Sequence, residues 1–129
     1  MVYSSCSLLV VEDEVVTRSV SVRLLRQLGV GMVTEASDGA EALVRCDRVA
    51  FDAILCDVDM APMNGLAFIE ALRGRERALS RNAPVIMLTK HNSADVILSA
   101  HRFGAAAYLV KPITPERLRE KLNRALGTP

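Results

Sequence analysis

The sequence predicts an α/β fold in which helices cover both faces of a five-stranded parallel sheet. Five short apolar segments recur along the chain, and each is followed by a segment whose apolar residues repeat at helical spacing. Strand-then-helix units in this order favour a parallel sheet with right-handed crossovers. With 129 residues the chain is long enough to bury a proper core. We therefore expect a single domain over residues 1–129.

The first predicted strand covers residues 7–11 and ends in the acids Glu12 and Asp13. After these acids the pattern changes to that of a helix, which Gly29 ends. Apolar residues recur at every fourth position of this helix, and they are Val16, Val20, Leu24 and Leu28. We expect this row to face the sheet.

The other four strands are predicted over residues 32–36, 53–56, 84–88 and 106–110. Each precedes a helical segment. The second helix follows Asp38 and ends near Arg48. The last helix has Thr114 as its N-cap and Pro115 at its first position, where both residue types are favoured. No linker or second domain is apparent.

Charge and cysteine content exclude several classes of protein. Sixteen basic and 15 acidic residues give a net charge of +1, which provides no general attraction to nucleic acid or to an anionic membrane. No apolar run approaches transmembrane length, and no basic segment precedes the first one. The three cysteines are far apart and lack the paired spacing of zinc sites or disulfide scaffolds. We expect a reduced, cytoplasmic protein with no membrane partner and no direct nucleic-acid partner.

Reactive side chains stand at the ends of four predicted strands. Glu12 and Asp13 follow the first strand, Asp57 the third, Thr89 the fourth and Lys111 the fifth. In the flavodoxin-like strand order 2-1-3-4-5, these ends meet at one edge of the sheet, where open α/β folds bind their ligands. Each residue alone has an ordinary structural explanation. Together they predict a site of three carboxylates, a hydroxyl and an ammonium.

Three clustered carboxylates imply a cation. Two carboxylates about 4 Å apart repel by about 4 kcal/mol at an effective dielectric constant of 20. A hard divalent ion would relieve that repulsion. Mg²⁺ fits a shallow site with few protein ligands better than Ca²⁺ does. We therefore expect Mg²⁺ as the cofactor.

The combination of these residues resembles the receiver domain of two-component response regulators, including the regulators of chemotaxis. The residues that carry the resemblance are Glu12, Asp13, Asp57, Met60, Met63, Asn64, Gly65, Thr89, Tyr108, Lys111 and Pro112. They extend over nearly the whole chain. The family fold is the five-stranded sheet already expected from the order of the elements.

The resemblance implies a phosphorylation switch. Asp57 is the expected phosphoacceptor, and Lys111 is expected to contact the phosphoryl group. Thr89 and Tyr108 form the expected switch pair. The donor would be a histidine kinase or a phosphotransfer protein of a phosphorelay. Beyond its own phosphorylation and dephosphorylation, the protein is not expected to be an enzyme.

The resemblance also implies the metal ligands and the output surface. Glu12, Asp13 and Asp57 would hold Mg²⁺ with the backbone carbonyl of Asp59. A downstream protein would bind the face formed by the fourth helix, fifth strand and fifth helix. Its predicted residues are Asp95, Arg102, Tyr108 and Arg119. No DNA-binding or catalytic domain follows in the sequence, which leaves open a stand-alone receiver or a domain of a longer protein.

Two departures from the family pattern and two tuning positions lie near the predicted site. Ala61 precedes Pro62 where the proline usually comes one residue earlier, so the loop path near the metal is expected to differ. Lys90 stands where a small residue usually follows the switch threonine. Asp59 and His91 occupy positions that resemble the family's tuning positions for phosphoryl lifetime. We predict that Lys90 pairs with Asp59 and slows hydrolysis.

Two other functions compete with the switch. The Asp57-Val58-Asp59 segment also resembles the nucleophile motif of haloacid dehalogenase phosphatases. That motif usually continues to threonine or valine, where this chain has Ala61, and it leaves the acid pair Glu12 and Asp13 unexplained. A short motif of this kind has a high false-positive risk. The second alternative is a receiver fold that no longer switches and serves as a docking module.

Overall fold

The sheet is parallel and has five strands in the order β2-β1-β3-β4-β5. The computed structural model describes residues 2–90 and 94–127. In chain order its elements are η1 Val2–Ser5, β1 Ser7–Val11, α1 Val15–Gln27, β2 Met32–Ala36, α2 Gly39–Arg48, β3 Ala53–Asp57, α3 Gly65–Arg73, β4 Val85–Thr89, α4 Ala94–Arg102, β5 Ala107–Val110 and α5 Pro115–Leu126. The predicted fold class and strand order are confirmed. The third, fourth and fifth strands differ by one residue from the predicted bounds.

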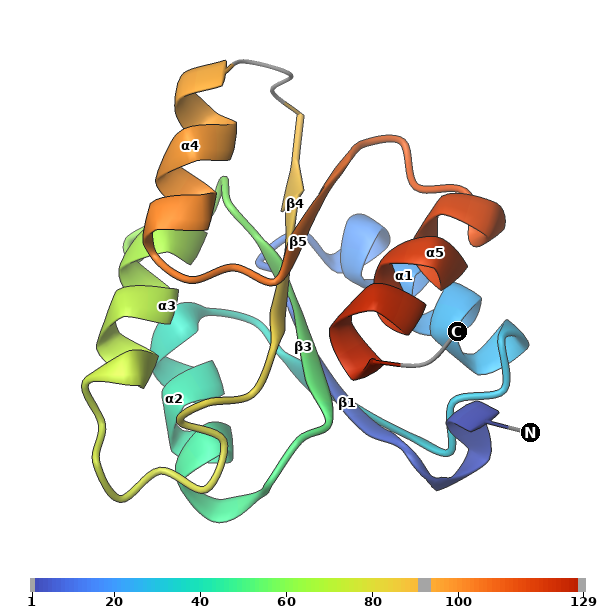
Figure 1. The fold of residues 1–129 in the computed structure, drawn as a ribbon, viewed down its shortest axis with the longest axis horizontal. Coiled ribbons are helices and arrows are strands. Elements are labelled where there is room, and N and C mark those ends of the chain that lie inside the picture. The colour runs from blue at the N-terminus through green and yellow to red at the C-terminus, as the bar shows by residue number, and fades with distance from the viewer. Residues whose placement is uncertain (1, 91–93, 128–129) are drawn as a thin grey trace.

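The helices form two layers, one on each face of the sheet. Figure 1 shows α1 and α5 on one face and α2, α3 and α4 on the other. Alternate residues of each central strand serve the two cores. Leu9 and Val11 of β1 pack on the α2 and α3 side, whereas Leu8 and Val10 pack on the α1 and α5 side. Both faces are covered, which explains why the central strands read as continuous apolar runs.

The predicted inward face of α1 is wrong. Val16 and Val20 are exposed, Leu24 is half-buried, and only Leu28 of that row is buried. A row of residues four apart turns by about 40° per step around a helix of 3.6 residues per turn, so its members do not share one face. The residues that are buried within α1 are Ser21, Val22 and Leu25.

The helix caps follow the sequence. Asp38 and Thr114 accept hydrogen bonds from the backbone N–H groups of Glu41 (2.7 Å) and Arg117 (3.3 Å). Asn64 does the same for Ala67 at the start of α3 (2.8 Å). Each cap satisfies a donor that the first helical turn leaves unpaired. None of the helices in the described part of the chain is long and apolar enough to span a bilayer.

Candidate functional site

Three acids gather at the carboxyl edge of the sheet. Glu12 follows β1 and Asp57 ends β3, and these two strands are hydrogen-bonded neighbours. Only 1% of Glu12 and 3% of Asp57 is exposed, whereas Asp13 is exposed. One carboxylate oxygen from each acid lies within 4.8 Å of the others. The cluster expected from the strand ends is therefore present, with one acid open to solvent.

Lys111, which follows the edge strand β5, connects two of these acids. Its Nζ donates to Glu12 Oε1 and to Asp57 Oδ2, each at 3.1 Å. The Lys111 backbone N–H donates to the Thr89 carbonyl at 2.8 Å, which ties the end of β5 to the end of β4. The Lys111–Pro112 peptide is cis. One ammonium thus bridges two buried carboxylates.

The charges in this cluster are not balanced. The pKa of Glu12 is raised to about 7, mainly by burial and then by the nearby Asp57, while Lys111 acts in the opposite direction. Burial alone would lower the pKa of Lys111, but its bonds to Glu12 and Asp57 outweigh burial, so that pKa is raised. The ammonium therefore stays charged. Its single charge does not fully offset the two buried acids, so the site favours a further cation.

The loop after β3 folds back over the acids. The backbone N–H of Asp59 donates to Asp57 Oδ1 at 3.2 Å. The N–H of Ala61 donates to Asp13 Oδ2 at 3.4 Å, and the Ala61–Pro62 peptide is cis. The loop thereby orients two of the three carboxylates. The Asp59 side chain is exposed.

Gly65 allows α3 to begin directly against the end of β3. Its N–H donates to the Val58 carbonyl at 3.0 Å. A Cβ at this position would lie 2.4 Å from the backbone oxygen of Asp57 and 2.6 Å from Met87 Cε. No side chain larger than hydrogen fits there without moving the end of β3. The glycine in the sequence motif is therefore explained by close packing.

The remaining predicted site residues lie on β4 and β5 or just beyond them. Thr89 is the last residue of β4 and is 1% exposed. Tyr108 lies in β5 with 36% of its surface exposed. Lys90 is exposed, and its pairing with Asp59 stays a prediction. His91 lies outside the described residues.

One residue of the site was missed by sequence reasoning. Arg18 of α1 donates from Nη1 to the backbone oxygen of Glu12 at 2.9 Å, and its Nε pairs with Glu35 at 3.1 Å. The Glu12 N–H in turn donates to the Ala36 oxygen at 3.1 Å. Arg18 thus fixes the backbone that carries the acid pair. Its place in the first turn of the helix that follows the acids was the signal that the sequence offered.

Comparisons with known proteins agree with this arrangement. A model of the response regulator receiver domain matches residues 8–123. The transcriptional regulatory protein ZraR of Salmonella typhimurium is 35% identical over 127 residues, which are 98% of this chain and 28% of ZraR. The chemotaxis protein CheY of Pseudomonas aeruginosa is 35% identical over 117 residues, which are 91% of this chain and 93% of CheY. The chain thus spans about a quarter of one relative and most of the other.

Solved structures give the same answer. The chemotaxis protein CheY4 of Vibrio cholerae superposes with a TM-score of 0.85 at 34% identity, covering 94% of this chain and 98% of CheY4. The receiver domain of sensor histidine kinase PA1611 from Pseudomonas aeruginosa has a TM-score of 0.84 at 31% identity. The match covers 95% of this chain and 98% of the PA1611 domain. That structure is described with a magnesium ion coordinated in its active site cleft. The shared fold and these matches show that the chain belongs to the response regulator receiver domain family.

Proposed function

We propose that Asp57 is the phosphoacceptor of this receiver domain, and that its modification changes the surface formed by α4, β5 and α5. One observation carries the proposal. Lys111 Nζ lies 3.1 Å from both Glu12 and Asp57, inside a cluster of three acids at the ends of neighbouring strands. A half-buried ammonium beside a buried carboxylate suits phosphoryl transfer, since that chemistry depends on positioning and charge neutralisation.

The three acids fit a magnesium ion. Their carboxylate oxygens lie within 4.8 Å of one another, and hard oxygen donors suit Mg²⁺. The side chains of Glu12, Asp13 and Asp57 and the backbone carbonyl of Asp59 would hold it. When bound, Mg²⁺ would neutralise charge on the transferred phosphoryl group. The magnesium described for the PA1611 receiver domain supports this assignment.

The chemistry at Asp57 is a displacement at phosphorus. A histidine kinase or phosphotransfer protein would present a phosphohistidine. An oxygen of Asp57 attacks the phosphorus, the P–N bond breaks, and its electron pair stays on the imidazole of the donor. Lys111 then donates a hydrogen bond to a phosphoryl oxygen. In this proposal the chain catalyses no reaction other than its own phosphorylation and dephosphorylation.

Modification would move the switch pair. A bond from the Thr89 hydroxyl to a phosphoryl oxygen contributes about 1 kcal/mol, and one from Lys111 about 1.5–3 kcal/mol. Inverting a population from 1:99 to 99:1 needs about 5.5 kcal/mol. These two hydrogen bonds do not supply the whole free energy of that inversion. Inward movement and burial of Tyr108, which is 36% exposed before modification, would supply part of the rest.

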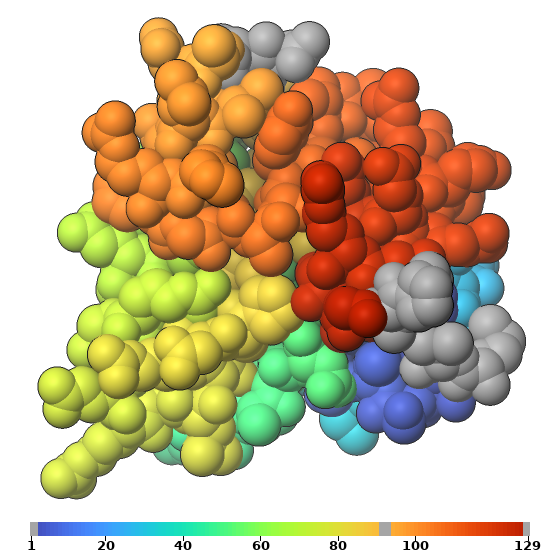
Figure 2. Space-filling view, viewed as in Figure 1, coloured from blue at the N-terminus to red at the C-terminus, as the bar shows by residue number. Residues whose placement is uncertain are grey.

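The output surface is the face that contains Tyr108. A hollow of about 420 Å³ lies there, lined mainly by apolar residues of α4 and β5 and by cations of α5. Figure 2 shows this side of the molecule, where α4 (orange) and α5 (red) flank the β5 segment. A downstream protein that binds here would sense the position of Tyr108. Asp95, Arg102 and Arg119 are the other residues that we assign to this surface.

One departure from the family pattern, Lys90, and one tuning position, Asp59, would set the lifetime of the phosphoryl group. Lys90 follows Thr89 directly, and Asp59 lies two residues after the acceptor. We propose that these two exposed side chains pair over the site and hinder attack by water. If Lys90→Ala leaves the dephosphorylation rate unchanged, this part of the proposal is wrong.

The central experiment uses a small phosphodonor. Incubation of the protein with acetyl phosphate and Mg²⁺ should add one phosphoryl group, detected by intact mass, and EDTA should prevent the addition. Asp57→Asn should abolish it. Undiminished labelling of Asp57→Asn would overturn the assignment of the acceptor. The two alternatives, a haloacid dehalogenase phosphatase and a non-switching module, are not favoured by the family matches.

A further inference from the structure

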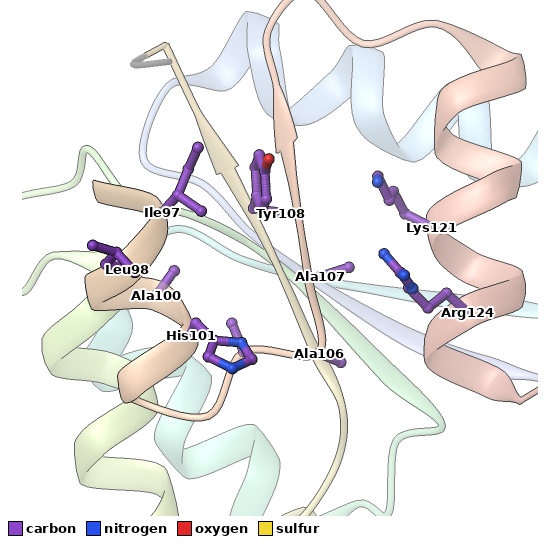
Figure 3. A pocket seen from close by; sticks show the side chains of 10 residues that line it. Ile97, Leu98, Ala100, His101, Ala106, Ala107, Tyr108, Lys121 and Arg124 are labelled. Atoms are coloured by element: carbon purple, nitrogen blue, oxygen red, sulfur yellow. The ribbon is translucent and has the colours of Figure 1, made fainter. Parts of the chain in front are cut away.

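Tyr108 makes a contact that the phosphorylation site does not explain. The ammonium of Lys121 lies 5.8 Å from the centroid of the Tyr108 ring. Figure 3 shows Tyr108 on β5 between Ile97 of α4 and Lys121 of α5, with the Lys121 side chain directed toward the ring. Cations within about 6 Å of an aromatic centroid are attracted by the ring. The contact therefore favours the outward position that Tyr108 has here.

The pair also divides the surface. Tyr108 and Lys121 both line the hollow of about 420 Å³ next to α4. Both residues also line a second hollow of about 310 Å³, together with Arg117 and Glu120 of α5. A move of Tyr108 toward the core would break the contact and remove the wall between the two hollows.

Lys121 projects from a firmly held helix. Leu118 and Leu122 of α5 are fully buried in the core. The hydroxyl of Tyr3 donates to Asn123 Oδ1, which ties α5 to the N-terminal turn. Since the helix is held on both sides of Lys121, the ammonium is presented to Tyr108 from a fixed backbone. The restraint therefore acts on the ring and not on the helix.

We propose that Lys121 is a positioning residue that holds Tyr108 outward and so opposes activation. The inference rests on the proposed role of Tyr108 in switching. An exposed cation–π contact biases an equilibrium by about two- to five-fold. A group that stabilises only the outward state must weaken, by the same factor, any ligand that favours the inward state. Loss of the ammonium should therefore make Asp57 easier to modify.

The test measures binding of beryllium fluoride, a phosphoryl mimic, in the presence of Mg²⁺. The protein has two tyrosines, so labelling with 3-fluorotyrosine gives one fluorine resonance for Tyr108 and one for Tyr3, which serves as an internal reference. Lys121→Met should lower the half-saturating beryllium concentration about two- to five-fold. Lys121→Arg keeps a cation over the ring and should behave as the wild type.

Two controls isolate the contact. Arg124 lines the same hollow one turn away on α5. Within the described residues, however, the cation that lies over the Tyr108 ring is Lys121. Arg124→Met should therefore leave beryllium fluoride binding unchanged. In a Tyr108→Ala background, Lys121→Met should not change beryllium fluoride binding, because Tyr108→Ala has already removed the ring that Lys121 contacts. The four proteins together form a double-mutant cycle.

The inference is overturned if Lys121→Met binds beryllium fluoride as the wild type does, or if it has the same effect without Tyr108. Failure of the proposed function gives a different result. In that case the wild type does not respond to beryllium fluoride, or Asp57→Asn responds equally. The contact itself is still tested then, because Lys121→Met must shift the Tyr108 resonance of the unmodified protein and leave that of Tyr3 in place.

Discussion

Replacing Lys111 by methionine tests the electrostatic account of the site most directly. The ammonium lies 3.1 Å from carboxylate oxygens of both Glu12 and Asp57, and 14% of its side chain is exposed. Ligand oxygens of the two acids lie within 4.8 Å of each other, so their mutual repulsion is at least about 3.5 kcal/mol at an effective dielectric constant of 20. Breaking a buried ion pair from one side costs about 3–5 kcal/mol. Proton uptake by one acid limits the loss, so we expect about 2–4 kcal/mol in EDTA.

Magnesium should reverse much of this loss. A ligand at 100 times its dissociation constant stabilises the folded state by about 2.7 kcal/mol. In Lys111→Met the dication takes over the ammonium's role as counter-charge to the two acids, so Mg²⁺ should bind more tightly and stabilise the variant more than the wild type. The assay is urea unfolding followed by far-ultraviolet circular dichroism, with EDTA or with saturating Mg²⁺.

Arg77→Met is the matched control. It removes one positive charge from an exposed side chain between α3 and β4, and surface changes of this kind usually alter stability by about 0.5 kcal/mol or less. The reasoning is refuted if Lys111→Met loses less than about 1 kcal/mol in EDTA. It is also refuted if the gap to the wild type is the same with and without Mg²⁺.

Three further predictions concern stability. The Ser21 hydroxyl is fully buried and has no hydrogen-bond partner in the described chain, so Ser21→Ala should raise the free energy of unfolding by about 1 kcal/mol in urea titrations. Gly65→Ala places a Cβ 2.4 Å from the Asp57 oxygen; it should lower stability by about 1–3 kcal/mol and slow labelling by acetyl phosphate, and wild-type values of both would contradict the packing argument. Burial raises the pKa of the Cys46 thiol from 9.0 to about 12. The folded state therefore holds this proton more tightly than the unfolded chain does. The stability that the bound proton contributes is fully present below about pH 9. It declines between about pH 9 and pH 12, by up to about 1.4 kcal/mol per pH unit. Cys46→Ala should make the fall of the urea midpoint above pH 9 less steep.

The sequence by itself determined the fold and the membership of the acid cluster. Five apolar segments alternating with helical ones define parallel strands, and the carboxyl ends of such strands share one edge of the sheet. That geometry places Glu12, Asp57, Thr89 and Lys111 together without any knowledge of side-chain contacts. The cap Thr114 was equally readable because capping is a local interaction.

The tertiary structure decided which faces and partners these residues use. The apolar row of α1 that begins at Val16 spirals around the helix, and only docking on the sheet selected the face with Val22 and Leu25. The bridge from Lys111 to two acids joins residues about a hundred and about fifty positions apart in the chain. The contacts of Arg18 with the Glu12 backbone and of Lys121 with Tyr108 join different elements in the same way. Such pairings depend on where packed elements place their side chains, and a periodic pattern along one segment carries no information about that.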